Sequence, residues 1–189
     1  MSSLSQTKPQ IQSASFVQVT QDGSGNRKVA YSLATLPQSI SDFTALPLME
    51  MQDPFATAAL IVIALANYQN NPQITIDMLN SIRGPQPLSA YDKQFLSDRL
   101  KGKEYKALSF FVGATPENGY EPARPYVIEI MEGIYSYVEA NYAKLQIQSG
   151  GADSARSVSL RLAKDGKWYF WEQFLLSDIR VSAAENPWL

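Results

Sequence analysis

The chain has 189 residues, of which 45% are hydrophobic and 18% are charged, and its formal net charge is −2. This composition is typical of a folded domain with a sizeable core, and it argues against a disordered chain and against a nucleic-acid partner. Cysteine and histidine are both absent, which excludes disulfides, Ser-His-Asp and Cys-His nucleophiles, and zinc sites built on Cys or His. An enzyme with this sequence would have to use Asp, Glu, Lys, Tyr or a cofactor.

The beginning of the chain is polar and lacks the apolar segment of a signal peptide. We expect residues 1–14 to be a flexible N-terminus and residues 15–189 to form a single domain. The longest apolar run, FATAALIVIALA at residues 55–66, is shorter than the ~20 residues that a membrane span needs. The sequence therefore predicts a cytoplasmic protein without a membrane partner.

Residues 15–35 predict a β-hairpin arm, because SFVQVT and KVAYSL alternate apolar and polar side chains on either side of QDGSGN. The GSG of this turn lacks the spacing of a phosphate-binding loop. Residues 34–52, which contain Pro37 and Pro47, are expected to be a linker.

Three helices are predicted within residues 53–102. The dipeptides DP at 53–54 and NP at 71–72 each combine an N-cap residue with a proline at the first helical position. Ser89 and Asp92 have the spacing of a capping box at the start of the third helix. The first helix is apolar on all sides, so we expect it at the centre of the core.

The apolar pattern changes to a period of two after the helices, which predicts an antiparallel sheet within residues 107–181. Strands are expected at 107–113, 126–132 and 142–150, and in a final hairpin around Asp165-Gly166. The order of elements predicts an α+β fold, in which three helices pack on a curved antiparallel sheet of about four to six strands with an N-terminal hairpin. This order resembles the NTF2-like architecture, although the strand hairpin that usually precedes the third helix is missing.

The register of the final hairpin sets how its aromatic strand, KWYFWEQFLL, is paired. We favour a two-residue Asp-Gly turn, which pairs Leu162 with Tyr169 and Leu160 with Trp171. A three-residue turn with a bulge at Gly166 would slip every partner by one and pair Leu160 with Phe170. In both registers, strict alternation gives two faces: Trp168, Phe170, Glu172, Phe174 and Leu176 on one, and Tyr169, Trp171, Gln173 and Leu175 on the other.

Both faces of this strand are largely apolar, so we expect both to be covered. The helices should cover one face, and the N-terminal hairpin, a second subunit or a ligand should cover the other. Glu172 is the polar exception, and Arg161 is expected to lie diagonal to it on the neighbouring strand. The two form either a structural ion pair or a pocket carboxylate that Arg161 orients.

The loop GATPENGYEPARPY at residues 113–126 is a second candidate region, because long loops are often functional. Arg124 could offer a hydrogen-bond donor and Tyr126 a ring to a ligand; the alternative is a rigid, proline-braced connection. No catalytic residue, cofactor or metal site is predicted. The candidate binding residues are Arg124, Tyr126, Arg161, Trp168, Phe170 and Glu172.

Several stretches resemble a known family: DPFATAALIVIALANY, DMLNSIRGPQPLSAYDKQFL, FFVGATPENGYEPARPY, SGGADSARSVSLRLAKDGKWYFWEQFLLSDIRV and the closing NPWL. Together, over residues 53–189, they resemble an uncharacterised family of bacterial domains of unknown function, common in anaerobic gut Gram-positive bacteria. The resemblance implies a bacterial, cytoplasmic origin, and it implies no activity, substrate or catalytic residue.

Two functions from different classes follow. The first is a non-catalytic domain that binds a small molecule or a protein with an aromatic sheet face, its partner being a small apolar or aromatic ligand or a second copy in a homodimer. The alternative is an NTF2-like pocket enzyme that uses Asp, Glu and Tyr. That enzyme would require a buried Glu172 with a raised pKa, close to a tyrosine hydroxyl. A further hypothesis is an assembly role in which subunits exchange the N-terminal hairpin.

Overall fold

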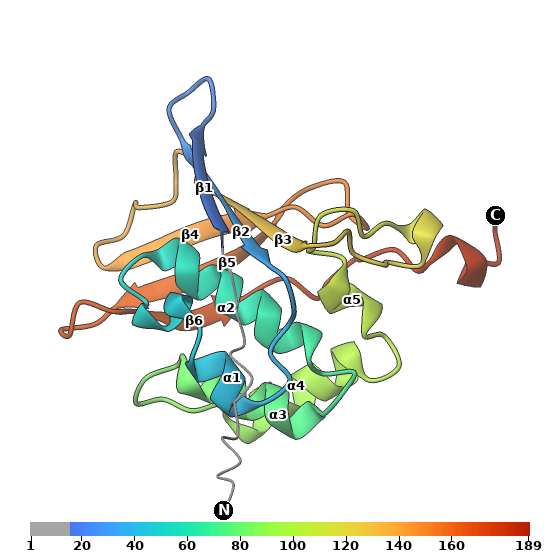
Figure 1. Cartoon of the computed structure of the whole chain (residues 1–189), viewed down its shortest axis with the longest axis horizontal. Helices are drawn as coiled ribbons and strands as arrows, with labels where there is room; N and C mark the ends of the chain where they lie inside the picture. Colours follow the sequence, from blue (N-terminus) through green and yellow to red (C-terminus); the bar gives the residue numbers. More distant parts are fainter. Residues whose placement is uncertain (1–15) are drawn as a thin grey trace, which may run out of the picture.

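The computed structural model describes residues 16–189, so the flexible terminus predicted for residues 1–14 lies outside the described part of the chain. These residues form one antiparallel sheet of six strands, in which spatial order follows chain order, and helices cover one side of it (Figure 1). The predicted α+β class is therefore confirmed. The strands are β1 (Phe16–Gln21), β2 (Arg27–Leu33), β3 (Tyr126–Met131), β4 (Tyr142–Ile147), β5 (Arg156–Leu162) and β6 (Trp168–Gln173).

The helical layer is formed mainly by the chain between β2 and β3. The three predicted helices are confirmed as α2 (Pro54–Ala66), α3 (Pro72–Ser81) and α4 (Ala90–Leu100), each with its expected N-cap bond. The predicted linker 34–52 contains two short helices that were not predicted from the sequence. The remaining short elements are α1 (Ile40–Thr44), η1 (Pro47–Glu50), α5 (Tyr105–Leu108), η2 (Pro116–Asn118) and η3 (Ala183–Glu185).

Helix α2 is the centre of the core, as its apolar sequence predicts. All of its residues are buried, and it contacts α3 and strands β3 to β6. Its polar side chain Thr57 donates a hydrogen bond of 2.6 Å to the carbonyl of Trp168. A buried hydroxyl needs such a partner, and this bond ties β6 directly to α2.

The outer edge of β6 is covered by the helical layer. The backbone N–H of Trp168 donates to the carbonyl of Met51, and that of Phe170 donates to the carbonyl of Ile82, both at 2.8 Å. Strand edges with unpaired backbone groups invite association with other chains. The loops before α2 and after α3 satisfy these groups, so this edge is closed within the domain.

The N-terminal hairpin of β1 and β2 continues the sheet. Strand β2 pairs with β3, and its side chains Val29, Tyr31 and Leu33 are buried in the core. On β1, Val17 and Val19 are exposed. Strand β2 therefore contributes side chains to the same hydrophobic core as α2.

The strand predicted at residues 107–113 is wrong. Helix α5 ends at Leu108 and is followed by turns. Ala107, Phe110 and Phe111 are buried, and their spacing of three and four residues fits one side of a helical turn. Only Val112 bonds like a strand residue: its N–H donates to Val127 and its carbonyl accepts from Ala123.

The favoured register of the β5–β6 hairpin is wrong beside the turn. Leu162 lies opposite Trp168 and Leu160 opposite Phe170, which is the alternative register. It arises because the backbones of Ala163 and Lys167 close a three-residue turn, with Gly166 at a φ of 79°.

A bulge then shifts the pairing back. Trp171 has no partner in the ladder, and Glu172 lies opposite Ser159, as the favoured register expects. Arg161 is two residues from Ser159 on β5, so Glu172 shares the outer face of the sheet with Arg161. The expectation that Glu172 lies on the same face as Phe170 is therefore wrong, because a bulge interrupts the alternation.

Candidate binding groove between α4 and β6

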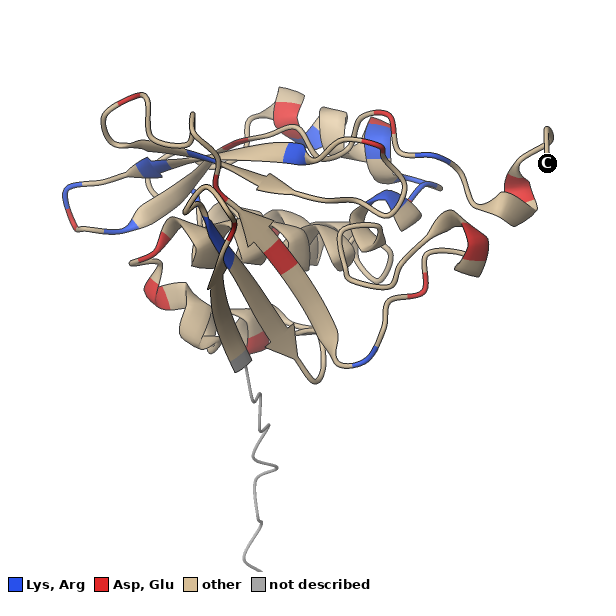
Figure 2. Cartoon of the chain, turned by 90° about the horizontal axis from the view of Figure 1, so that it is seen from above, with Lys and Arg blue, Asp and Glu red and all other residues tan. Residues whose placement is uncertain are grey.

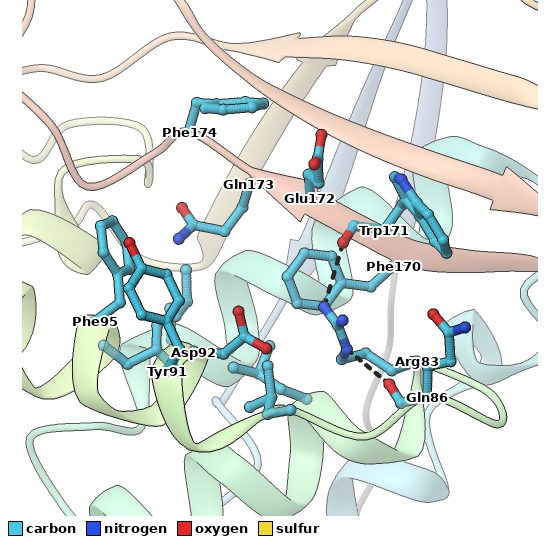
Figure 3. Close-up of a pocket in the computed structure, with 14 residues that line it drawn as sticks. Arg83, Gln86, Tyr91, Asp92, Phe95, Phe170, Trp171, Glu172, Gln173 and Phe174 are labelled. Atoms are coloured by element: carbon cyan, nitrogen blue, oxygen red, sulfur yellow. Dashed lines mark hydrogen bonds between the residues drawn. The ribbon is translucent and has the colours of Figure 1, made fainter.

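A groove of about 360 Å³ lies between α4, the loop that precedes it, and the end of β6 (Figure 3). Its floor is apolar: Leu79, Leu96 and Phe170 are all at least 95% buried. Its lining residues are Leu65, Leu79, Arg83, Gln86, Leu88, Tyr91, Asp92, Phe95, Leu96, Phe170, Trp171, Glu172, Gln173 and Phe174.

The wall formed by α4 is aromatic and is fixed by the start of that helix. Ser89 and Asp92 form the predicted capping box, which sets where the first turn begins. Tyr91 and Phe95 are four residues apart, so they lie one above the other on one face of α4. Figure 3 shows the two rings side by side at the groove. Phe174, which is 52% exposed, lies on the β6 side.

Arg83 is the cation of the groove. Its Nε donates to the carbonyl of Gln86 at 2.9 Å, and its Nη1 donates to the carbonyl of Trp171 at 3.2 Å. Its guanidinium carbon lies 5.0 Å from the ring centre of Phe170. The side chain is half-buried and is held by neutral groups.

Two carboxylates line the groove in different settings. One oxygen of Asp92 accepts hydrogen bonds from the backbone N–H of Ser89 at 2.8 Å and from the Ser89 hydroxyl at 2.7 Å. Glu172 is exposed, and in Figure 3 its carboxylate points away from Asp92. The first carboxylate is used to cap α4, and the second lies in solvent.

Of the predicted site residues, Phe170 and Glu172 line the groove. Trp168 is half-buried at the start of β6, where it packs against the core. Arg161 lies on the outer face, with its guanidinium carbon 4.7 Å from the ring centre of Trp171 and 5.5 Å from that of Tyr142.

The ion pair expected between Arg161 and Glu172 is absent from residues 16–189, because the bulge at Trp171 places an aromatic ring beside the guanidinium instead. The ion pairs of this part of the chain are Arg27–Asp53, Lys28–Glu129 and Arg180–Asp153.

The two candidates from the 113–126 loop pack against each other. The guanidinium carbon of Arg124 lies 4.1 Å from the ring centre of Tyr126. The Tyr126 ring in turn meets Phe111 edge-on, with centroids 5.6 Å apart. Neither Arg124 nor Tyr126 lines the groove.

The groove residues that were not predicted from the sequence come from the helical layer. Arg83 follows α3, and Tyr91 and Phe95 belong to α4, which is polar apart from a few positions. The available signal was the pair of aromatic residues Tyr91 and Phe95, four residues apart in the first turns after the N-cap Ser89. That spacing marks one face of the helix, and only the tertiary fold shows that β6 lies opposite it.

A second hollow, of about 350 Å³, lies on the outer face of the sheet. It shares Trp171 and Glu172 with the groove, so the bulged end of β6 separates the two. Its other lining residues are Tyr135, Ser136, Val138, Glu139, Tyr142, Ala143, Lys144 and Ser159.

Two buried titratable groups, Lys106 and Tyr120, lie outside both hollows. Lys106 donates from Nζ to the carbonyl of Leu176 at 3.2 Å, and burial lowers its pKa. Burial raises the pKa of Tyr120 to about 12, and its hydroxyl donates to the carbonyl of Arg180. Both side chains have the backbone partners that a structural role requires. Residues 16–189 contain no cluster of acidic side chains that could hold a metal ion.

Basic and acidic residues are interspersed along the ribbon (Figure 2). In the part of the chain that the structure describes, every helix is too short or too polar to cross a membrane.

These features define an α+β domain with an open, six-stranded antiparallel sheet, a fully buried central helix and an aromatic groove at one sheet edge. The chain belongs to a family described as a domain of unknown function, DUF6935, whose model matches residues 35–183. The hairpin of β1 and β2 precedes the matched region. No curated protein and no solved structure matches the chain.

Proposed function

We propose that this domain is a non-catalytic binding module that takes a small apolar or aromatic ligand in the groove between α4 and β6. The observation that carries the proposal is the combination of an apolar floor, aromatic walls and a few polar groups in about 360 Å³. Small-molecule sites have this composition and volumes of roughly 300–1,000 Å³.

The enzyme alternative is less well supported, because the carboxylate on which it depends is exposed. A general acid or base at neutral pH needs a perturbed pKa, and a low-dielectric setting is the usual cause. Cytoplasmic location and an NTF2-like classification stay predictions from the sequence.

Removing one aromatic wall tests the proposal. Tyr91 is 77% exposed, so Tyr91→Ala should leave the fold intact. An aromatic pair contributes roughly 0.5–1.5 kcal/mol beyond area burial, so we expect the variant to bind 3-phenylpropanol about tenfold more weakly than the native domain. Amide chemical shifts during a ligand titration give the affinity and locate the ligand.

Tyr135→Ala is the matched control. Tyr135 is 75% exposed and lines the other hollow, so its loss should leave the affinity for 3-phenylpropanol unchanged. Equal weakening by both variants, or no saturable binding by the native domain, would refute the groove as the binding site.

A second candidate function is protein interaction through the loop between β3 and β4. Ile134, Tyr135 and Val138 are each 75% exposed. Ser136 holds the loop in place, because its hydroxyl donates to the carbonyl of Lys144 at 2.6 Å and accepts from the N–H of Gly133 at 2.9 Å. Exposed apolar groups on a fixed backbone are typical of interaction sites, and a homodimer is the simplest partner.

Sedimentation equilibrium over a wide range of protein concentrations tests this second candidate. We expect the native domain to dimerise with rising concentration and Val138→Asp to remain a monomer, since a buried unpaired carboxylate is costly. Tyr91→Ala, on the groove, should dimerise like the native domain. A native domain that stays monomeric throughout would eliminate the homodimer.

A further inference from the structure

We propose that the groove selects ligands that carry a carboxylate, and that Arg83 is the residue that pairs with it. This inference rests on the proposed function and adds the chemical class of the ligand: a small monocarboxylic acid whose apolar body is an aromatic ring or a branched chain.

The argument begins with the charge on Arg83. A guanidinium has five N–H donors, and two of its nitrogens donate to the carbonyls of Gln86 and Trp171. The third nitrogen, Nη2, makes no hydrogen bond within residues 16–189. The ion pairs of that part of the chain also leave Arg83 without a carboxylate partner. Every buried side-chain nitrogen and oxygen of this part of the chain has a hydrogen-bond partner, so Nη2 is open to solvent. A bound carboxylate could accept its hydrogens and supply a counterion through a charge-assisted hydrogen bond.

Arg83 is also held in place before any ligand arrives. Its two backbone acceptors lie on opposite sides of the groove, one in the loop before α4 and one on β6 (Figure 3). The ring of Phe170, on the groove floor, lies 5.0 Å from the guanidinium carbon. A planar guanidinium fixed in this way loses little entropy when it binds a carboxylate. A ligand whose apolar body lies on Phe170 would therefore have its acidic end beside Arg83.

The two acidic side chains of the lining do not reverse this preference. Asp92 accepts two hydrogen bonds at the N-terminus of α4, where the helix dipole compensates a negative charge. Glu172 is exposed, so water and salt screen its field. Arg83 is half-buried, and within residues 16–189 no carboxylate pairs with it.

The experiment compares three probes of one shape on the full chain: 3-phenylpropionate, 3-phenylpropanol and 3-phenylpropylammonium. We expect the carboxylate to bind about tenfold more tightly than the alcohol, and the ammonium to bind more weakly than the alcohol. The advantage of the carboxylate should shrink as sodium chloride is added, because it is electrostatic. Amide shifts at Arg83 and Phe170 would place each probe in the groove.

Arg83→Gln should remove the advantage of the carboxylate while leaving binding of the alcohol, since the amide can still donate to one backbone carbonyl. Arg161→Gln, on the outer face, is the control, and this variant should still bind the carboxylate more tightly than the alcohol. If Arg83→Gln does not fold, the order of the affinities of the native chain for the three probes still tests the carboxylate inference.

Equal affinities for the three probes, or tighter binding of the ammonium, would overturn the carboxylate inference and leave the proposed function standing. Failure of all three probes to bind would overturn both.

Discussion

Replacing Gly150 with alanine should destabilise the domain by about 3 kcal/mol, the upper end of the cost of overpacking a core. A Cβ at this position would lie far inside van der Waals contact of the carbonyl oxygen of Ala114. The backbone has little freedom to retreat, because the N–H of Gly150 donates to the carbonyl of Ser109 at 2.8 Å. For a chain of this size we expect the melting temperature to fall by roughly 6–12 °C, which calorimetry or urea denaturation would measure.

Gly133→Ala is the control for this prediction. A Cβ at Gly133 would meet no atom within 4 Å, so the free energy of unfolding should change by less than about 0.5 kcal/mol. Equal stability of Gly150→Ala and Gly133→Ala would show that residues 148–155 do not pack against residues 109–115 in solution.

The helices around the core were predictable because their signals are local. Asp53, Asn71 and Ser89 each cap a helix with their own side chain, so each start is encoded within three or four residues. The burial of α2 was predictable for a related reason, since a helix that is apolar on all sides can only be stable inside the protein.

The segment at residues 107–113 was not predictable with the same rules. Its apolar residues fit a strand and a helical turn equally well, and the run is too short for its length to decide. The outcome depends on tertiary contacts: Ser109, buried in the turn after α5, accepts a hydrogen bond from the Ser149 hydroxyl at 2.7 Å. That partner is on a distant loop, so no local pattern contains the information.

The hairpin and the groove show the same limit. Asp-Gly favours a two-residue turn, but the loops at Met51 and Ile82 bind the outer edge of β6. Trp171 forms a bulge, and its carbonyl accepts a hydrogen bond from Arg83. The register therefore depends on partners that are distant in sequence. Phe170 was predicted as a binding residue, and it lies on the groove floor. Arg83 and Tyr91 were missed because their position depends on how α3 and α4 pack against that strand.

Phe170→Ala should destabilise the domain by roughly 3–5 kcal/mol, the usual cost of truncating a buried phenylalanine. The ring is 5% exposed, belongs to the core cluster around α2 and also forms the floor of the groove. Alanine would leave a cavity beside Arg83 and remove the ring beneath its guanidinium. The free energy of unfolding from urea denaturation gives the loss directly.

Two neighbouring substitutions separate the core role of Phe170 from its role in the groove. Phe174→Ala, on the same segment but 52% exposed, should cost less than about 1 kcal/mol, because surface truncations are usually mild. Phe170→Leu keeps most of the buried volume, so it should cost about 1.5 kcal/mol or less while weakening the binding of 3-phenylpropanol through loss of the aromatic floor. If Phe170→Ala cost no more than Phe174→Ala, Phe170 would not face the core, and the register of β6 described above would be wrong by one residue.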